Sequence, residues 1–285
     1  MILVMARIKA LRRFASILIT VSIASCSSVE IEIAPEAHYQ PPKIIAHCGY
    51  WDVEGSAENS IASLRNAGEI GVFASEFDIQ LTSDDVLVIC HDPIINGINI
   101  HDSSLAEIRK SDNRLRNGEL IPTLDDYFQE ALRYPDLNLV LELKSYGEKE
   151  YEIRAINACE NKIKEYQLSE RIIFISFSLT ACQSLKRIFK KNTVLYLNGD
   201  KTPQELYELG LDGLNCHYSY YNSHPNWIYD TIKLGMHSGA WTVDQEEDIA
   251  MLIEKGVEFI TTNSPMMALN YVADNAKLID DRTNI

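Results

Sequence analysis

Short β-rich runs alternate with stretches of helical periodicity along most of this chain of 285 residues. Such alternation predicts a parallel sheet, because consecutive parallel strands are joined by crossover helices. The strand candidates are apolar on both faces, which is typical of a barrel or of a doubly wound sheet. No Gly-x-Gly-x-x-Gly sequence follows the first strand candidate, so a dinucleotide-binding doubly wound sheet is disfavoured. The sequence therefore predicts an α/β fold of the (β/α)8 TIM-barrel type.

The strand candidates number one more than an eight-stranded barrel can hold. Two of them, at 73–81 and 86–91, are separated by too few residues for a parallel crossover, so we expect a local reversal there. Residues 93–122 break the alternation and are predicted to be an insertion on the functional face, with a short helix near 103–110. The remaining strand candidates are 43–47, 137–144, 171–177, 193–198, 211–216, 238–243 and 257–262; the helix candidates are 59–70, 123–133, 149–167, 178–190, 202–209, 225–235 and 245–255.

The first residues have the features of a secretory signal. Basic side chains precede an apolar run that is too short to span a bilayer and fits the core of a signal peptide. The run ends in Ile-Ala-Ser-Cys, which resembles a bacterial lipobox with Cys26 as the lipidated residue; the alternative is a plain signal peptide cut near Ser25. We expect an exported protein that is lipid-anchored in the cell envelope, on the periplasmic or surface face. Its predicted parts are a signal peptide at 1–25, a tether at 26–42 and the barrel domain at 43–285.

The charge balance of the chain is acidic, with 26 Lys and Arg against 41 Asp and Glu and a formal net charge of −15 at pH 7. Removal of residues 1–25 would make the charge more negative, because this segment contains basic but no acidic residues. Phosphate backbones are held by clusters of Lys and Arg, so the balance argues against nucleic acid as a partner. It is compatible with a site that concentrates a divalent cation.

Acidic side chains lie in or at the end of two strand candidates. Glu76 and Asp78 are two residues apart in one strand and therefore face the same side. Two adjacent carboxylates repel unless a cation lies between them, and oxygen ligands suit Ca²⁺ or Mg²⁺. Glu142, on a nearby strand, would supply a third ligand. The alternatives are that Glu76 and Asp78 are solvated surface acids, and that Glu142 only forms a salt bridge with Lys144.

Two histidines end other strand candidates. His47 ends the first, and His91 ends the third and is followed by Asp92, which would orient its neighbour or cap a turn. Since imidazole titrates near neutral pH, such a pair suits one general base and one general acid. The carboxyl ends of barrel strands converge on one mouth, so we expect both histidines beside the acidic residues. Most of the cysteines are expected to be buried, and a pairing of Cys48 with Cys90 is left open.

These residues, taken in order, resemble the glycerophosphodiester phosphodiesterase family. The likeness spans 43–268, and its segments here are His47-Cys48-Gly49, Ala57-Glu58-Asn59-Ser60, Glu76-Phe77-Asp78, His91-Asp92, Glu142-Leu143-Lys144, Ser176-Phe177, Trp241-Thr242-Val243-Asp244 and Thr262-Asn263-Ser264-Pro265. The resemblance implies a (β/α)8 barrel, one divalent metal ion, Ca²⁺ or Mg²⁺, and cleavage of glycerophosphodiesters to glycerol phosphate and an alcohol.

The same resemblance implies roles for individual residues. The metal ligands would be Glu76, Asp78 and Glu142, and the acid–base pair would be His47 and His91. Lys144 would contact the phosphate, and Trp241 would either line the substrate pocket or pack in the core. Asn59 would either cap the first helix or touch the ligand.

One position departs from the family pattern, because Cys48 stands where the family has a phosphate-binding arginine. Arginine holds phosphate oxygens with two donors, and loss of such a donor can lower a rate about a hundredfold or more. Arg109, Arg114 and Arg116, in the predicted insertion, are candidates to replace it. The alternatives are a phosphodiesterase or cyclising lyase for another headgroup, and a weakly active or non-catalytic lipoprotein that binds phosphodiesters.

Overall fold

The structure is a computed structural model that describes residues 41–110, 113–145 and 147–283. The signal peptide predicted for 1–25, the lipidated Cys26 and nearly all of the tether predicted for 26–42 lie outside these residues. The division of the chain and the lipid anchor therefore stay predictions. Among the described helices, none combines the length and the apolar character that a membrane span requires.

Eight parallel strands form a closed barrel, as the sequence predicted. The ring closes because β1 pairs in parallel with both β11 and β2. A ninth strand, β3, pairs antiparallel with β2, which confirms the predicted reversal. The nine strands, each within one of the predicted runs or a residue beyond it, are β1 (Lys43–Ala46), β2 (Ala74–Leu81), β3 (Leu87–Ile89), β6 (Asn138–Leu143), β7 (Ile172–Ser176), β8 (Val194–Tyr196), β9 (Gly213–His217), β10 (His237–Trp241) and β11 (Phe259–Thr262).

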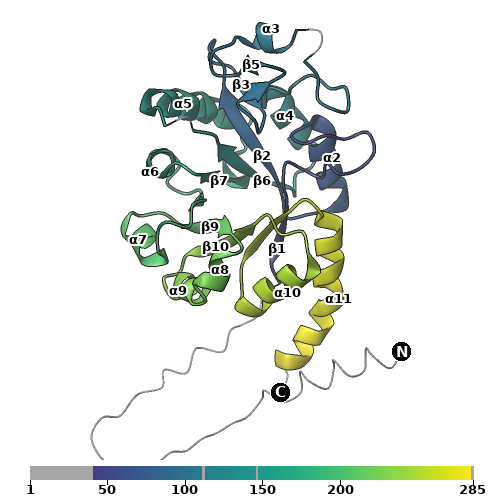
Figure 1. Cartoon of the computed structure of the whole chain (residues 1–285), viewed down its shortest axis with the longest axis vertical. Helices are drawn as coiled ribbons and strands as arrows, with labels where there is room; N and C mark the ends of the chain where they lie inside the picture. Colours follow the sequence, from purple (N-terminus) through teal and green to yellow (C-terminus); the bar gives the residue numbers. More distant parts are fainter. Residues whose placement is uncertain (1–40, 111–112, 146, 284–285) are drawn as a thin grey trace, which may run out of the picture. The chain divides into compact units, whose positions relative to one another are not determined.

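Helices surround the strands (Figure 1). A capping box at Thr123 begins α4: the Thr123 side chain accepts from Asp126 N, and the Thr123 backbone N–H donates to the Asp126 carboxylate. The last helix, α11 (Pro265–Thr283), was not predicted, although Pro at the first helical position is a common start signal. The other helices around the barrel are α2 (Ile61–Ile70), α4 (Leu124–Ala131), α5 (Lys149–Glu165), α6 (Leu179–Ile188), α7 (Pro203–Glu208), α8 (Tyr220–Ser223), α9 (Trp227–Lys233) and α10 (Glu246–Lys255).

Side chains of β2 alternate between the outside and the inside of the barrel. Phe77 points outward and packs on Tyr127 of α4, with ring centroids 4.4 Å apart. Glu76 and Asp78 point inward. The residue before them on the same face, Ala74, belongs to an apolar cluster that fills the barrel interior. Polar groups are thus placed above an apolar floor. That cluster consists of Ile45, Ala74, Val140, Ile175, Leu195, Leu197 and Phe259.

The predicted insertion forms a small unit beside β3. It contains the hairpin β4 (Ile94–Ile95) and β5 (Ile98–Asn99), followed by the short helix α3 (Leu105–Ile108). Its own apolar cluster joins Ile100, Ile108 and Ile121 to Val88 and Cys90 of the β3 segment. The insertion is therefore packed onto the strand end that carries His91.

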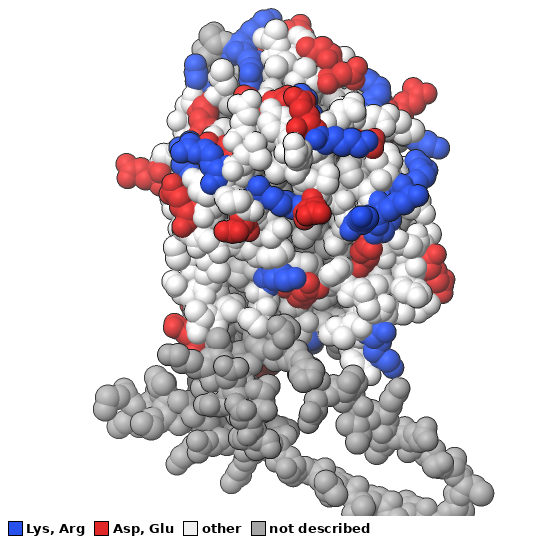
Figure 2. Space-filling view, turned by 180° about the vertical axis from the view of Figure 1, so that it is seen from behind, with Lys and Arg blue, Asp and Glu red and all other residues white. Residues whose placement is uncertain are grey.

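Charged side chains of both signs are interspersed on the face drawn in Figure 2. Ion pairs also join neighbouring elements of the barrel: Lys162 Nζ of α5 lies 2.7 Å from Asp125 Oδ1 of α4, and Lys186 Nζ of α6 lies 2.7 Å from Asp212 Oδ2. Exposed pairs of this kind stabilise a fold by about 1 kcal/mol or less each. The stability of the barrel therefore depends mainly on its buried apolar residues.

The turn after β1 requires glycine at Gly49. Its φ is +77°, and a Cβ there would lie 2.5 Å from Ser63 Oγ and 2.7 Å from the Ser63 backbone carbon. Gly55 has a similar φ of +76° but has open space around it.

Left-handed backbone costs a non-glycine residue about 1–2 kcal/mol, and overpacking adds about 1–3 kcal/mol. We expect Gly49→Ala to lower the free energy of unfolding by roughly the sum of these amounts, and Gly55→Ala by the first amount alone. Equal midpoints of urea unfolding for the two variants would contradict this.

Candidate active site

Two of the predicted acidic residues face each other across neighbouring strands. Asp78 of β2 is the register partner of Glu142 of β6, so both side chains point into the barrel. Lys144 follows β6 on the same face, and its Nζ lies 2.8 Å from Asp78 Oδ1 and 2.7 Å from Glu142 Oε1. The predicted salt bridge between Glu142 and Lys144 thus exists, as one part of a larger cluster.

Glu76 completes this cluster from the middle of β2. The residue is 2% exposed, so the alternative of a solvated surface acid is wrong. Its Oε2 accepts a hydrogen bond of 2.8 Å from Cys48 N, while its Oε1 is buried without a hydrogen-bond partner among the described residues. A buried carboxylate oxygen with no donor is costly, and it marks a place where a cation or a proton is needed.

The cluster contains more negative than positive charge. Burial and then the neighbouring Asp78 raise the pKa of Glu142 to about 8, and the same two causes raise the pKa of Glu76 well above its ordinary value. Burial also acts on Asp78, but Lys144 and His91 hold its pKa below its ordinary value. One ammonium does not balance three carboxylates, so the group favours either protonation or a further cation.

The donor set fits a divalent metal ion. One oxygen from each of Glu76, Asp78 and Glu142 can be chosen so that all lie within 4.8 Å of one another. Carboxylate oxygens are the ligands that Ca²⁺ and Mg²⁺ prefer, and a double positive charge would offset the carboxylates that Lys144 leaves unbalanced. The orphaned Glu76 Oε1 is then supplied with a partner.

Asn59 holds Asp78 in place. Its Nδ2 donates to Asp78 Oδ2 at 2.7 Å, and its Oδ1 accepts from Asp78 N at 3.1 Å. The helix that follows is capped by Ser60, whose side chain accepts from Ser63 N. Of the two alternatives for Asn59, the helix cap is therefore wrong by one residue. Asn59 instead orients one of the candidate ligands and lines the cavity described below.

His47 is oriented by a chain of hydrogen bonds that the sequence did not reveal. Its Nδ1 lies 2.8 Å from Asn263 Oδ1, which also accepts from Trp51 Nε1 at 3.1 Å. Asn263 Nδ2 donates to Asp244 Oδ2, and this bond fixes which end of the amide faces His47. His47 Nδ1 is therefore the protonated nitrogen of the neutral ring. Its Nε2 is left as a proton acceptor.

His91 stands at the end of β3, where its ring is half exposed. Its Nδ1 lies 2.8 Å from Asp92 Oδ1. Of the two roles predicted for Asp92, this contact fits the one in which Asp92 orients its neighbour. Cys90, the residue before His91, donates its backbone N–H to Asp78 O at 3.0 Å, and the charge of His91 helps to lower the pKa of Asp78. His47 and His91 therefore both lie at the end of the barrel that carries the carboxylates, as the convergence of strand ends predicted.

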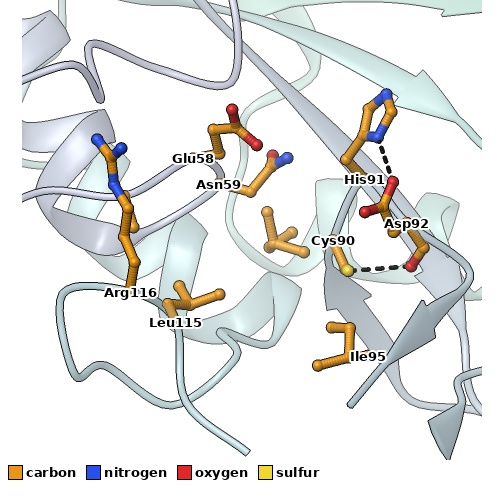
Figure 3. A pocket seen from close by; sticks show the side chains of 10 residues that line it. Glu58, Asn59, Cys90, His91, Asp92, Ile95, Leu115 and Arg116 are labelled. Atoms are coloured by element: carbon orange, nitrogen blue, oxygen red, sulfur yellow. Dashed lines mark hydrogen bonds and ion pairs between the residues drawn. The ribbon is translucent and has the colours of Figure 1, made fainter. Parts of the chain in front are cut away.

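A cavity of about 270 Å³ opens beside His91. Cys90, His91 and Asp92 form one wall, and Leu115 and Arg116 of the insertion stand across from them (Figure 3). A pocket of this size and mixed polarity is suited to a small organic group. The insertion thus completes a binding cavity on the functional side of the barrel. The remaining lining residues are Ala57, Glu58, Asn59, Ile89 and Ile95.

The three candidate arginines differ in their surroundings. Arg109 is held by Asp126, at 2.7 Å, and by the carbonyl of Ile121. Arg114 donates to Gly118 O within its own turn. Arg116 lines the cavity; its guanidinium lies 4.7 Å from the centroid of the Trp51 ring. Of the three, only Arg116 is part of the cavity that contains His91.

Cys48 points into the cluster and is 1% exposed. Its Sγ lies 3.6 Å from Asp78 Oδ2 and 3.8 Å from His47 Nε2. Burial and then the charges of Asp78 and Glu76 raise the pKa of the thiol well above its ordinary value. The thiol is free, as is that of Cys90, so the two do not form a disulfide.

Trp241 lies at the end of β10, where it is half buried. Its indole packs against the apolar cluster of the barrel interior, and its Nε1 donates to Asn215 O at 2.7 Å. Phe177 and His217 meet it edge-on. These contacts show that Trp241 packs in the core, which was one of its two predicted roles. That Trp241 also lines a substrate pocket stays a prediction.

Comparisons with known proteins place this chain in a family. The model of the Glycerophosphoryl diester phosphodiesterase family matches residues 42–267. A glycerophosphodiester phosphodiesterase of Caldanaerobacter subterraneus subsp. tengcongensis is 33% identical over 246 residues, which are 80% of this chain and 97% of the relative.

Solved structures give the same result. A glycerophosphodiester phosphodiesterase of Parabacteroides distasonis shares 42% identity with a TM-score of 0.81, over 83% of this chain and 98% of that chain. A phosphodiesterase of Oleispira antarctica, solved in complex with the product sn-glycerol-3-phosphate, shares 26% identity with a TM-score of 0.72, over 81% and 97% of the two chains. The family match covers the whole barrel and the relatives align along nearly their full length, so this chain belongs to the glycerophosphoryl diester phosphodiesterase family.

Proposed function

We propose that the protein hydrolyses glycerophosphodiesters to glycerol 3-phosphate and an alcohol, in a reaction that depends on Ca²⁺ or Mg²⁺. The observation that carries the proposal is the buried acidic cluster, with its orphaned Glu76 Oε1, beside two hydrogen-bonded histidines. Phosphodiester cleavage needs charge neutralisation, a proton acceptor and a proton donor, and these groups provide all three. The Oleispira antarctica relative is described as a complex with the product sn-glycerol-3-phosphate, which supports the same product here.

The divalent ion would be held by Glu76, Asp78 and Glu142. When bound, such an ion neutralises phosphate oxygens and lowers the pKa of an attacking hydroxyl group. Lys144 adds a second positive charge at the same edge, where its Nζ already contacts two of the carboxylates. With the ion present, this ammonium would be free to contact a phosphate oxygen.

The two histidines would divide the proton transfers. The Nδ1–H of His47 is held by Asn263, so Nε2, which faces Cys48 Sγ at 3.8 Å, would accept the proton of the attacking nucleophile. His91 is held at Nδ1 by Asp92 and stands on the wall of the cavity, so its protonated ring would donate to the leaving alkoxide. The cavity beside His91 would then hold the departing alcohol.

Arg116 would replace the arginine that the family has at Cys48. Its Nη2 and Nε donate to the carbonyls of Trp51 and Ser56, at 2.8 Å and 3.2 Å, and neither partner carries a charge. Its positive charge is therefore not neutralised by an ion pair among the described residues. Two backbone anchors and the Trp51 ring also preorganise the guanidinium, which lowers the entropic cost of binding an anion.

The reaction is tested by the products. Glycerophosphocholine and related diesters are incubated with the full chain and Ca²⁺ or Mg²⁺, and free glycerol 3-phosphate is expected, with turnover lost in EDTA. A cyclic phosphate product would indicate the cyclising lyase instead. Absence of turnover that Cys48→Arg restores would indicate a site that the cysteine disables. Turnover that survives either His47→Ala or His91→Ala would contradict the assigned mechanism.

The role of Arg116 is tested against its neighbour in the insertion. Loss of a charged donor to phosphate costs about 1.5–3 kcal/mol, so Arg116→Ala is expected to lower kcat/KM by about tenfold or more. Arg114→Ala is the matched control, because its guanidinium only closes the local turn to Gly118 O. Equal rates for the two variants would show that Arg116 does not bind the phosphate.

A further inference from the structure

The sulfur of Cys48 lies among groups that bind transition metals. His47 Nε2 is 3.8 Å from Cys48 Sγ, and Asp78 Oδ2 is 3.6 Å from it. His47, Cys48 and Glu76 each offer one ligand atom, and the three atoms lie within 4.8 Å of one another. Nitrogen, sulfur and oxygen together are a donor set that suits zinc, whereas Ca²⁺ and Mg²⁺ favour oxygen alone.

These separations agree with the geometry of a tetrahedral zinc site. Zinc lies about 2.3 Å from thiolate sulfur and about 2.0–2.1 Å from imidazole nitrogen, so two such ligands stand about 3.5 Å apart. The Sγ of Cys48 and the Nε2 of His47 would need to approach each other by only a few tenths of an ångström.

One of the donors is oriented as metal-binding histidines are, and another is without a partner. The Nδ1–H of His47 is held by Asn263, and its Nε2 faces Cys48 Sγ at 3.8 Å. Glu76 Oε1 is buried with no hydrogen-bond partner among the described residues. By contrast, Cys159 is just as buried but sits in the main apolar core. The surroundings of Cys48 are therefore unlike those of a cysteine that only fills space.

We propose that His47, Cys48 and Glu76 form a binding site for Zn²⁺, which overlaps the proposed Ca²⁺ or Mg²⁺ site through Glu76. On binding, the S–H bond of the thiol breaks, a sulfur–zinc bond forms and the proton passes to solvent, so no oxidant or reductant is required. An arginine at position 48 could not ligate a metal ion. The residue that distinguishes this chain from the family pattern is thus the residue that creates the site.

Zinc bound at this site would affect the reaction, an inference that rests on the proposed function. Zinc would take the Nε2 of His47, which would otherwise accept a proton, and one oxygen of Glu76, which would otherwise hold the catalytic ion. Zinc therefore inhibits turnover that Ca²⁺ or Mg²⁺ supports. Binding of zinc itself does not depend on which phosphodiester is cleaved.

The site is tested first by spectroscopy with Co²⁺ as the probe. Titration of the full chain with Co²⁺ is expected to give a near-ultraviolet sulfur-to-cobalt charge-transfer band, which added Zn²⁺ removes. The band is expected to disappear in Cys48→Ser and to persist in Cys90→Ser, a nearby buried cysteine outside the triad. A wild-type protein without the band, or a Cys48→Ser protein that keeps it, would overturn the proposal. A wild-type protein without the band overturns the proposal even where a variant does not fold.

The consequence is tested by inhibition, with each protein compared to its own zinc-free rate. The zinc concentration that halves turnover is expected to be at least about tenfold higher for Cys48→Ser than for wild type. Equal half-inhibitory zinc concentrations for the two proteins would overturn the inhibitory role of zinc at Cys48. If the wild-type protein turns over no diester, with or without zinc, the proposed function fails. The Co²⁺ band still tests the metal site independently.

Discussion

Three carboxylates are buried in the mouth of this barrel with one ammonium between them, and this imbalance governs the site. Each buried charge without a counter-charge costs several kcal/mol, so the group cannot be fully ionised by itself. Burial and mutual repulsion raise the pKa of Glu142 to about 8, and Glu76 Oε1 is buried with no donor among the described residues. A divalent cation resolves both problems at once. The same charge is what a phosphodiester needs when its bond is broken.

The barrel is what forces these charges together. Parallel pairing of β2 with β6 sets Asp78 opposite Glu142, and closure of the ring through β1 brings His47 to the same edge. The apolar outer face of β2, with Phe77 packed on α4, prevents the strand from turning its acids to solvent. The packing of the core therefore offsets the cost of burying these carboxylates together, in the arrangement that phosphodiester cleavage requires.

Period-two spacing made part of this site predictable. Glu76 and Asp78 must share a face in any strand, and polar strand ends must meet in any barrel, so the cluster and its lysine follow from the sequence. The orientation of His47 does not follow, because Asn263, which also accepts from Trp51, reaches His47 only once β1 and β11 are paired. The sequence did not decide between Asn59 and Ser60 as the cap of α2, since Asn and Ser are both common caps. The surroundings of Cys48 depend on three strands at once and could not be derived from spacing.

The central claim is that the acidic cluster holds a divalent ion, and it is tested most directly by thermal unfolding. An ion that binds only the folded state stabilises it, so added Ca²⁺ or Mg²⁺ is expected to raise the Tm of the wild-type protein in a concentration-dependent manner. Glu76→Gln keeps the shape of the side chain but removes its charge, and it is expected to abolish this increase. A wild-type Tm that does not respond to either ion, or a Glu76→Gln protein that responds equally, would contradict the claim.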